Sequence, residues 1–506
     1  MTVEFLSEIR DSDITALREK VSRRSYGKYL HRIAIERLRG FENQEISFDF
    51  PVTALVGPNG GGKTSILGAA GLIYREVEPR RFFLKSGKYD TSMKNWRVEY
   101  EVTDKDLNPR LPVRRTASYT ESKWNRNAEE RRVVIFGVDR TVPASERKAL
   151  SKFASGKFEA PFEIDLQQEI LREVARILGK EFTDCRRLQM DREGRVSLFA
   201  AEDSSGLKYS EFHFGAGEAS VIRIVSEMEQ APENSLLLIE EIENGLHPIA
   251  TRKLVEYLVT IARRKSAQVI FTTHSNDALA PLPSQAIWAA VNGRLLQGKL
   301  DVKALRTLVG QVDARAAIFV EDSFAESMTR VVMRYANDLS ADGIEVHGMG
   351  GWEPAISVHV QHSKNPSVGF PSICILDGDQ HDRADAGKGI FAFPGDTAPE
   401  VHVISRILDV LDAEASRLAL SLQLPTSMQD RVKQVIRKIN ATIRDRHLFF
   451  QQVGDELDYT AAQVVQDAFL AIWAQRFPEE VEYIARGIRQ VLENPSWKKS
   501  AARRSS

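Results

Sequence analysis

The sequence predicts an α/β protein with two domains of alternating strands and helices, followed by a helical region. Two observations lead to this prediction. In the first part of the chain, a glycine-rich loop stands between a strand-like run and a helix-like run. In the second part, strands again alternate with helices, and two of the strands end in acids. The length of 506 residues also suits two or three domains rather than one.

The composition is that of an ordinary globular protein, with 42% hydrophobic and 27% charged residues. The formal net charge of -1 excludes a globally basic nucleic-acid binder but leaves local basic faces open. Cys185 and Cys374 lie far apart, so we expect no disulfide framework and a reducing, cytoplasmic setting. No apolar run approaches the length of a membrane span, and we therefore expect no membrane partner.

We expect the first domain to cover residues 1–300, with an amphipathic helix within 1–27. Strand-like runs from Tyr29 onward end at a loop that matches GxxxxGK[ST] in full, and a helix-forming run follows. Glycines let backbone N–H groups turn inward to bind an anion, and the helix points its positive end at the same place. These flanks disfavour a chance glycine-rich turn. The predicted ATP-binding residues are Gly57, Pro58, Asn59, Gly60, Gly61, Gly62, Lys63, Thr64 and Ser65, with Lys63 on the β/γ-phosphates and Thr64 on Mg²⁺.

Two later strand-like runs end in residues that we expect to act together with this loop. The run 235–239 ends in Glu240 and Glu241, at the strand end where α/β sites lie. We assign Glu240 to the metal ion and Glu241 to the attacking water. The run 269–273 ends at His274, which is placed to contact the γ-phosphate.

A further segment, residues 214–218, begins a helix with small residues and so offers another anion site. The residues that we assign to nucleotide binding there are Gly215, Gly217 and Glu218.

The order and spacing of these four segments resemble the ABC-type ATPase heads of the SMC and RecF kind, over roughly residues 28–295. The resemblance implies that 57–64 is Walker A, 214–218 the signature loop, 236–241 Walker B and His274 the switch histidine. Gly215 and Ala216 replace the Ser and the first Gly of the usual signature core. The resemblance also implies a homodimer or higher oligomer, since such heads hold ATP between two protomers.

Residues 90–210 are predicted to form an inserted lobe of strands. Its arginines and lysines, with Trp124 among them, suit contacts to phosphate backbones. Because acids are interspersed, a plain solvated face remains an equal alternative.

The second domain is expected over residues 313–405, after a hinge at 296–312. One strand ends at Glu321 and another ends in Asp377-Gly378-Asp379. Alternate residues of a strand share a side, so we expect both aspartates to face one ion with Glu321 as a third ligand. Three carboxylates suit Mg²⁺ or Mn²⁺, and such ions activate water for phosphodiester cleavage. A surface turn is the alternative for the aspartates.

This pattern resembles a TOPRIM domain, and an ABC head followed by TOPRIM is the arrangement of the OLD family of ATP-dependent nucleases. The resemblance implies an ATP-hydrolysing, metal-dependent endonuclease in antiviral defence against phage, with DNA favoured over RNA and a second defence-system protein as a candidate partner. Asp322 stands where the family often has Gly, and Lys388 or Glu400 is a candidate to complete the site.

Residues 406–506 have helical spacing and predict a capping or dimerising bundle, with contact to nucleic acid as the alternative. Two other functions stay open. One is an ATP-dependent sensor or scaffold whose TOPRIM module does not cleave. The other is a RecF-like DNA repair ATPase.

Overall fold

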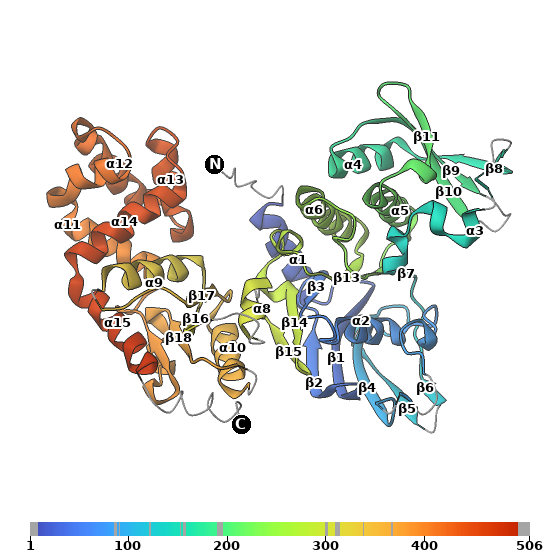
Figure 1. The fold of residues 1–506 in the computed structure, drawn as a ribbon, viewed down its shortest axis with the longest axis horizontal. Coiled ribbons are helices and arrows are strands. Elements are labelled where there is room, and N and C mark those ends of the chain that lie inside the picture. Colours follow the sequence, from blue (N-terminus) through green and yellow to red (C-terminus); the bar gives the residue numbers. More distant parts are fainter. Residues whose placement is uncertain are drawn as a thin grey trace. The chain divides into compact units, whose positions relative to one another are not determined.

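The computed structural model describes residues 9–493 except 86–88, 91, 121–122, 152, 155–157, 190–195, 299–301, 309–313, 337 and 366–367. The chain forms two compact units, unit 1 (Met1–Val302) and unit 2 (Lys303–Ser506), shown in Figure 1. Helix α1 (Asp11–Ser22) falls within the predicted 1–27 segment, of which residues 1–8 lie outside the described residues. The predicted hinge at 296–312 lies partly outside them as well.

The core of unit 1 is a six-stranded sheet in the order β15-β14-β3-β13-β12-β7. Only β15 runs antiparallel to its neighbour. The central strands β3, β12 and β13 are buried along their whole length, in keeping with their mostly apolar sequences. The strands are β3 (Val52–Val56), β7 (Val133–Phe136), β12 (Leu236–Ile239), β13 (Gln268–Thr272), β14 (Ile287–Val291) and β15 (Arg294–Gln297).

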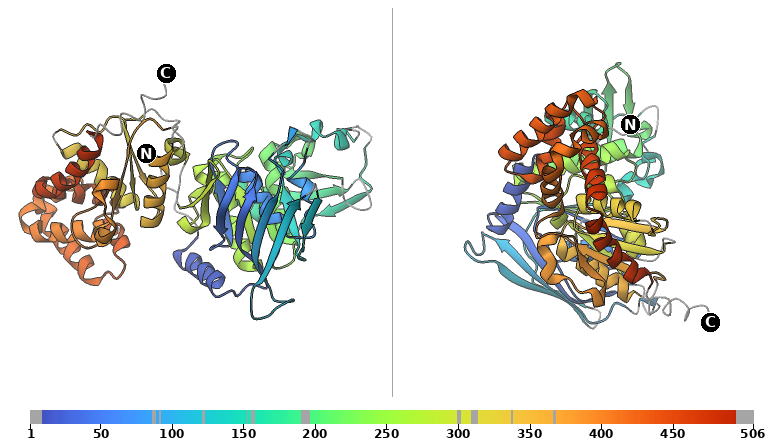
Figure 2. Two further views of the ribbon diagram at one scale, coloured as in Figure 1. Left: turned by 90° about the horizontal axis from the view of Figure 1, so that it is seen from below. Right: turned by 90° about the vertical axis from the view of Figure 1, so that its left-hand side faces the viewer.

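A second, antiparallel sheet in the order β2-β1-β4-β5-β6 forms a separate layer of unit 1 (Figure 2). Helix α2 (Lys63–Leu72) is almost entirely buried and shares one hydrophobic core with strands of both sheets. The strands of this sheet are β1 (Lys28–Leu38), β2 (Phe41–Ser47), β4 (Trp96–Asp104), β5 (Val113–Thr120) and β6 (Lys123–Arg126).

Residues 90–210, which we expected to form one inserted lobe, are divided between three sheets. β4 alternates buried and exposed residues, so it pairs beside β1 in the half-buried antiparallel sheet. The short apolar β7 pairs instead with β12 in the core. Only the later strands form a sheet of their own, in the order β11-β10-β9-β8: β8 (Phe162–Asp165), β9 (Phe182–Gln189), β10 (Ser197–Asp203) and β11 (Lys208–Ser210).

The helices α4 (Gln168–Leu178), α5 (Ala216–Gln230) and α6 (Pro248–Lys265) of unit 1 pack together. Three basic residues occupy the last turn of α6, where they complement the negative end of the helix dipole. Two single-turn helices, α3 (Lys148–Ser151) and α7 (Asn276–Leu279), complete the unit.

Unit 2 contains a four-stranded, wholly parallel sheet in the order β17-β16-β18-β19. The strands are β16 (Ala316–Val320), β17 (Ile344–Gly348), β18 (Ser372–Leu376) and β19 (Ile390–Ala392). The helices between them are α9 (Ser323–Tyr335) and α10 (Trp352–Lys364), and α8 (Val302–Leu308) precedes the sheet.

The carboxyl-terminal helices are not a separate body. Buried residues from β16 to α15 form one hydrophobic core that includes the sheet and the helices after it. These helices are α11 (Pro399–Ser421), α12 (Gln429–Thr442), α13 (Phe449–Glu456), α14 (Ala462–Arg476) and α15 (Pro478–Leu492). Among the described helices, none combines the length and apolarity needed to cross a bilayer.

Candidate functional site

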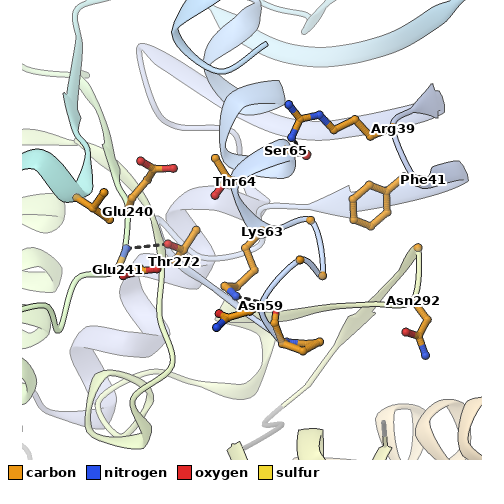
Figure 3. Close-up of a pocket in the computed structure, with 17 residues that line it drawn as sticks. Arg39, Phe41, Asn59, Lys63, Thr64, Ser65, Glu240, Glu241, Thr272 and Asn292 are labelled. Atoms are coloured by element: carbon orange, nitrogen blue, oxygen red, sulfur yellow. Dashed lines mark hydrogen bonds between the residues drawn. The ribbon is translucent and has the colours of Figure 1, made fainter. Parts of the chain in front are cut away.

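A cavity of about 560 Å³ lies where the glycine-rich loop meets the carboxyl ends of β12 and β13 (Figure 3). Its volume is in the range that suits a small-molecule ligand. Every residue from Pro58 to Ser65 lines it, and Glu240 and Glu241 face them from the other side (Figure 3). The structure therefore brings together the loop and both acids at the end of β12.

The glycines of the loop are required by close packing. Gly57 (φ 146°) and Gly62 (φ 98°) adopt backbone angles that side chains rarely allow. A Cβ on Gly57 would lie 2.3 Å from the carbonyl oxygen of Ala290, and one on Gly62 would lie 2.4 Å from the Phe41 ring. Larger residues would push the loop away from these two neighbours.

The side chain of Lys63 points back toward the glycine-rich loop. Its Nζ donates to the carbonyl oxygens of Gly57 (2.9 Å) and Pro58 (3.0 Å). Burial lowers the pKa of Lys63, and the charge of Glu241 opposes this shift. Thr64 is exposed at the cavity, in keeping with a metal-facing hydroxyl.

Glu241 has an unusual backbone conformation for a residue with a side chain. Its φ of 46° lies in the left-handed region. Residues other than glycine that adopt such strained backbone angles are enriched at functional sites. The Glu241 N–H donates to Thr272 Oγ1 at 2.8 Å, and the Glu241 carboxylate accepts from Asn244 Nδ2 at 2.8 Å. These bonds fix the acid that we assign to the attacking water.

Sequence reasoning missed Arg140, which holds both acids through their backbone. This side chain is 5% exposed. Its Nη1 donates to the carbonyls of Gly137 (2.9 Å) and Glu240 (2.5 Å). Its Nη2 donates to the Glu241 carbonyl (2.6 Å) and its Nε to Ser220 Oγ (2.9 Å). Burial lowers the pKa of Arg140 to about 10. One guanidinium thus connects the end of β12, the loop after β7 and the start of α5.

His274 follows β13 and is exposed. Its backbone N–H donates to Glu243 Oε1 (2.5 Å), and Thr273 Oγ1 donates to Glu243 Oε2 (2.7 Å). Partial burial and the charge of Lys63 lower the pKa of His274. The histidine is near the site but does not line the cavity.

The three predicted signature residues lie away from the cavity of their own chain. Gly215 is the exposed N-cap of α5. A Cβ on Gly217 would lie 2.1 Å from the Gly245 carbonyl oxygen, so this glycine is needed for packing. Glu218 accepts from Lys180 Nζ (3.0 Å) and Tyr209 Oη (2.9 Å). Their predicted role concerns the nucleotide of a partner protomer and stays a prediction.

Two hairpin turns supply lining residues that no sequence motif marked. Arg39 lies in the turn between β1 and β2, and Phe41 is the first residue of β2 (Figure 3). Asn292 and Gly293 form the turn between β14 and β15. Arg39 Nη1 donates to Ser65 Oγ at 3.2 Å. The only local signal was that of a turn, which does not reveal where the turn lies in the fold.

Unit 2 places a second group of acids at the carboxyl ends of adjacent parallel strands. Asp377 N–H donates to Glu321 Oε1 at 2.8 Å. Glu321 is 8% exposed and Asp377 9% exposed. The argument from strand alternation was wrong for Asp379, because β18 ends at Leu376. Asp379 lies in the 3-10 segment that follows, where it is exposed.

Glu400, in the first turn of α11, joins these residues. We call Glu321, Asp377, Asp379 and Glu400 the acidic cluster. Burial and the charges of Glu321 and Asp322 raise the pKa of Asp377 to about 9. Burial and the charge of Asp379 raise the pKa of Glu321 to about 7. These raised pKa values mean that the surroundings of the cluster disfavour its negatively charged form.

Two oxygen atoms of the acidic cluster lack partners. Asp377 Oδ1 and Glu400 Oε2 are buried without a hydrogen bond from any described residue. The other Glu400 oxygen lies 2.7 Å from His447 Nδ1. Lys388, the other candidate to complete the site, pairs with Asp385 at 2.7 Å instead.

Carboxylate oxygens are the ligands that Mg²⁺ and Mn²⁺ prefer, so the donor chemistry of the cluster fits a hard cation. In the part of the chain that the structure describes, however, no three His, Cys, Asp or Glu side chains are close enough to hold one ion. Binding of an ion would therefore require these carboxylates to move closer together.

Comparison with known families gives a match for part of unit 1. The family described as "AAA domain, putative AbiEii toxin, Type IV TA system" matches residues 52–280. No curated protein matches the chain.

Several solved structures resemble about half of the chain at low identity. An SMC head bound to the C-winged helix domain of ScpA has a TM-score of 0.38 and 13% identity, and covers 53% of this chain and 97% of that one. The SMC head domain from Thermotoga maritima has a TM-score of 0.34 and 13% identity, with coverage of 53% and 97%. The recombination mediator RecF with ATP has a TM-score of 0.32 and 13% identity, with coverage of 54% and 98%.

The family match spans the glycine-rich loop, both acids after β12 and His274. It ends before unit 2 and does not bear on the acidic cluster. Together with the geometry of the cavity, it supports an ATPase domain in unit 1.

Proposed function

We propose that this protein is an ATP-hydrolysing, metal-dependent endonuclease of the OLD type that cleaves DNA in defence against phage. Unit 1 would bind and hydrolyse ATP, and unit 2 would cut phosphodiester bonds. The matched family's description includes a putative toxin, and nucleic-acid cleavage is one activity through which a toxin acts.

At the ATP site, the loop amides and Lys63 would hold the phosphates, while Thr64 and Glu240 would face Mg²⁺. Glu241, fixed by Thr272 and Asn244, would orient the attacking water. Gly215, Gly217 and Glu218 would approach the nucleotide of a second protomer. The head dimer is part of the proposal.

In unit 2, Glu321, Asp377 and Asp379 would hold Mg²⁺ or Mn²⁺, with Glu400 beside them. Such an ion, when bound, activates water and stabilises the leaving oxygen. Glu321 also accepts from the Asp377 N–H, and this hydrogen bond links the ends of β16 and β18.

One observation carries the nuclease proposal. Asp377 and Glu400 each bury a carboxylate oxygen without a hydrogen-bond partner among the described residues. An unpaired buried acceptor costs about 1–3 kcal/mol, and a cation would remove that cost. The acids lie at the carboxyl ends of a parallel sheet, where α/β proteins place their sites.

A different observation favours the second candidate, a sensor or scaffold ATPase. The described carboxylates do not converge on one point as they stand. In that function, unit 2 would bind nucleic acid or a partner protein without cleaving it. Its binding would depend on the nucleotide state of unit 1.

Cleavage of supercoiled plasmid with Mg²⁺ or Mn²⁺, with and without ATP, separates these functions. The nuclease proposal expects nicking or linearisation that Asp377→Asn and Asp379→Asn abolish. The matched control is Asp382→Asn, an exposed acid in the same 3-10 segment, which should cleave normally. Intact ATP hydrolysis without cleavage of DNA or RNA would support the sensor. Equal cleavage by all variants would exclude the acidic cluster.

A further inference from the structure

A second recess of unit 1 adjoins the nucleotide cavity. It has a volume of about 420 Å³ and is lined by four arginines, Arg81, Arg140, Arg147 and Arg223, and by one acid, Asp139. The loop after β7 separates the two spaces, since Val138 lines the nucleotide cavity while its neighbours Gly137 and Asp139 line the recess. We call this space the arginine recess.

The arginines of the recess outnumber the acids that pair with them. Arg147 and Arg223 share the carboxylate of Glu211, at 3.1 Å and 2.5 Å. Arg81 and Asp139 are 3.8 Å apart. Among the described residues, three of the four guanidinium groups thus pair with two carboxylates.

Arg140 contributes charge without an ion pair of its own among the described residues. Its four hydrogen bonds reach three backbone carbonyls and the Ser220 hydroxyl, all of them neutral. The charges of Glu243, Asp139, Glu241 and Glu240 act on it, but among the described residues none of these acids forms an ion pair with it. A buried cation in this position gains from an added anion.

Arg223 has an unused donor in the same place. Its Nε is buried and has no hydrogen-bond partner among the described residues. Its guanidinium lies 5.0 Å from the centre of the Phe199 ring and bonds Glu211 through Nη2. The charge of Arg223 also lowers the pKa of Arg147, after burial, which marks repulsion between the two cations.

We propose that the arginine recess binds a phosphate group. Guanidinium groups recognise phosphate through paired, charge-assisted hydrogen bonds, and a phosphate would balance the surplus positive charge. The group could come from the backbone of a nucleic acid or from a small phosphate. Both sources present the same chemistry to the arginines.

A phosphate here would also act on ATP hydrolysis. Arg140 lines the recess and donates to the carbonyls of Glu240 and Glu241. An anion that attracts Arg140 changes how firmly these two acids are held. This coupling rests on the proposed ATPase function, whereas binding to the recess does not.

Calorimetric titration with inorganic phosphate tests the binding. The nucleotide site is first saturated with Mg²⁺ and a non-hydrolysable ATP analogue, so that phosphate cannot enter it. Arg81→Gln should weaken binding about tenfold, the loss of one charge-assisted contact. Asp139→Asn removes the acid of the recess and should tighten binding. Arg37→Gln, an exposed arginine on β1, is the matched control and should change nothing.

A second titration uses a short single-stranded oligonucleotide in place of inorganic phosphate. Binding of the oligonucleotide alone, with the same response to both variants, identifies a nucleic-acid backbone as the source. Binding of phosphate alone identifies a small phosphate. Absence of both, or affinities that neither Arg81→Gln nor Asp139→Asn alters, would overturn the proposal. If the protein binds phosphate but does not hydrolyse ATP, the proposal for the arginine recess stands and the proposed ATPase function is wrong.

Discussion

Arg140 connects three segments that are far apart in the chain. A lysine in its place would keep the charge but lose the planar fork that reaches several carbonyls at once. We therefore expect Arg140→Lys to lower kcat for ATP about tenfold, the cost of roughly one such contact, with little change in ATP affinity. Phosphate release and binding of a fluorescent ATP analogue measure the two quantities. A parallel fall in ATP affinity and melting temperature would mean that Arg140 is only structural.

Glu241 makes a separate prediction about chemistry. Glu241→Gln keeps the size of the side chain and the bond to Asn244 but removes the charge that polarises water. ATP hydrolysis should fall by about 10²–10⁴-fold while ATP binding persists, as for the loss of a general base. Single-turnover hydrolysis checks this, with Glu233→Gln, an exposed acid ahead of the same strand, as the control. Normal turnover in Glu241→Gln would remove this residue from the mechanism.

At the scale of elements, α15 is attached to α11 and α14 through one buried acid. Glu480 accepts from His402 Nε2 (2.9 Å), Trp473 Nε1 (2.7 Å) and the Arg406 guanidinium. Burial alone would raise its pKa, but these donors together lower the pKa of Glu480 to about 2. The charged form is therefore the one that stabilises the folded unit.

This depressed pKa sets the pH dependence of unit 2. The stabilisation is present above the ordinary glutamate pKa of 4.5 and is lost as the pH falls toward about 2. Glu480→Gln should reduce the free energy of unfolding by about 3 kcal/mol at neutral pH. The difference from the wild type should shrink below pH 4.5. Chemical denaturation across this pH range measures it, and Glu479→Gln, the exposed neighbour, should behave as wild type.

For the whole molecule, the proposed head dimer gives a test of assembly. ATP and Mg²⁺ should convert Glu241→Gln into a stable dimer, because it binds ATP without hydrolysing it. Gly215→Glu added to this variant should keep it monomeric, since the new carboxylate would face the phosphates of the partner site. A Cβ at Gly215 meets no atom within 4 Å, so the substitution should leave the fold intact. Light scattering gives the mass, and a mass that ATP does not change would contradict the dimer.

The sequence alone determined the parts of this protein that are local. The glycine-rich loop, the acids after β12 and the ends of β16 and β18 each follow directly from an apolar strand, so a short window contains both the chemistry and its support. For the same reason, Glu240, Glu241, Glu321 and Asp377 could be named before any fold was known.

Only the tertiary structure decided which distant residues complete these sites. Arg140 and the carbonyl of Glu240 are 100 residues apart in the chain, and they meet because β7 pairs with β12. The two hairpin turns reach the nucleotide cavity only through the packing of the two sheets around α2. Asp379 lies outside the strand because β18 ends at Leu376, earlier than the sequence pattern predicted. Strand pairing and packing between segments distant in the sequence produce these contacts, and no local pattern encodes them.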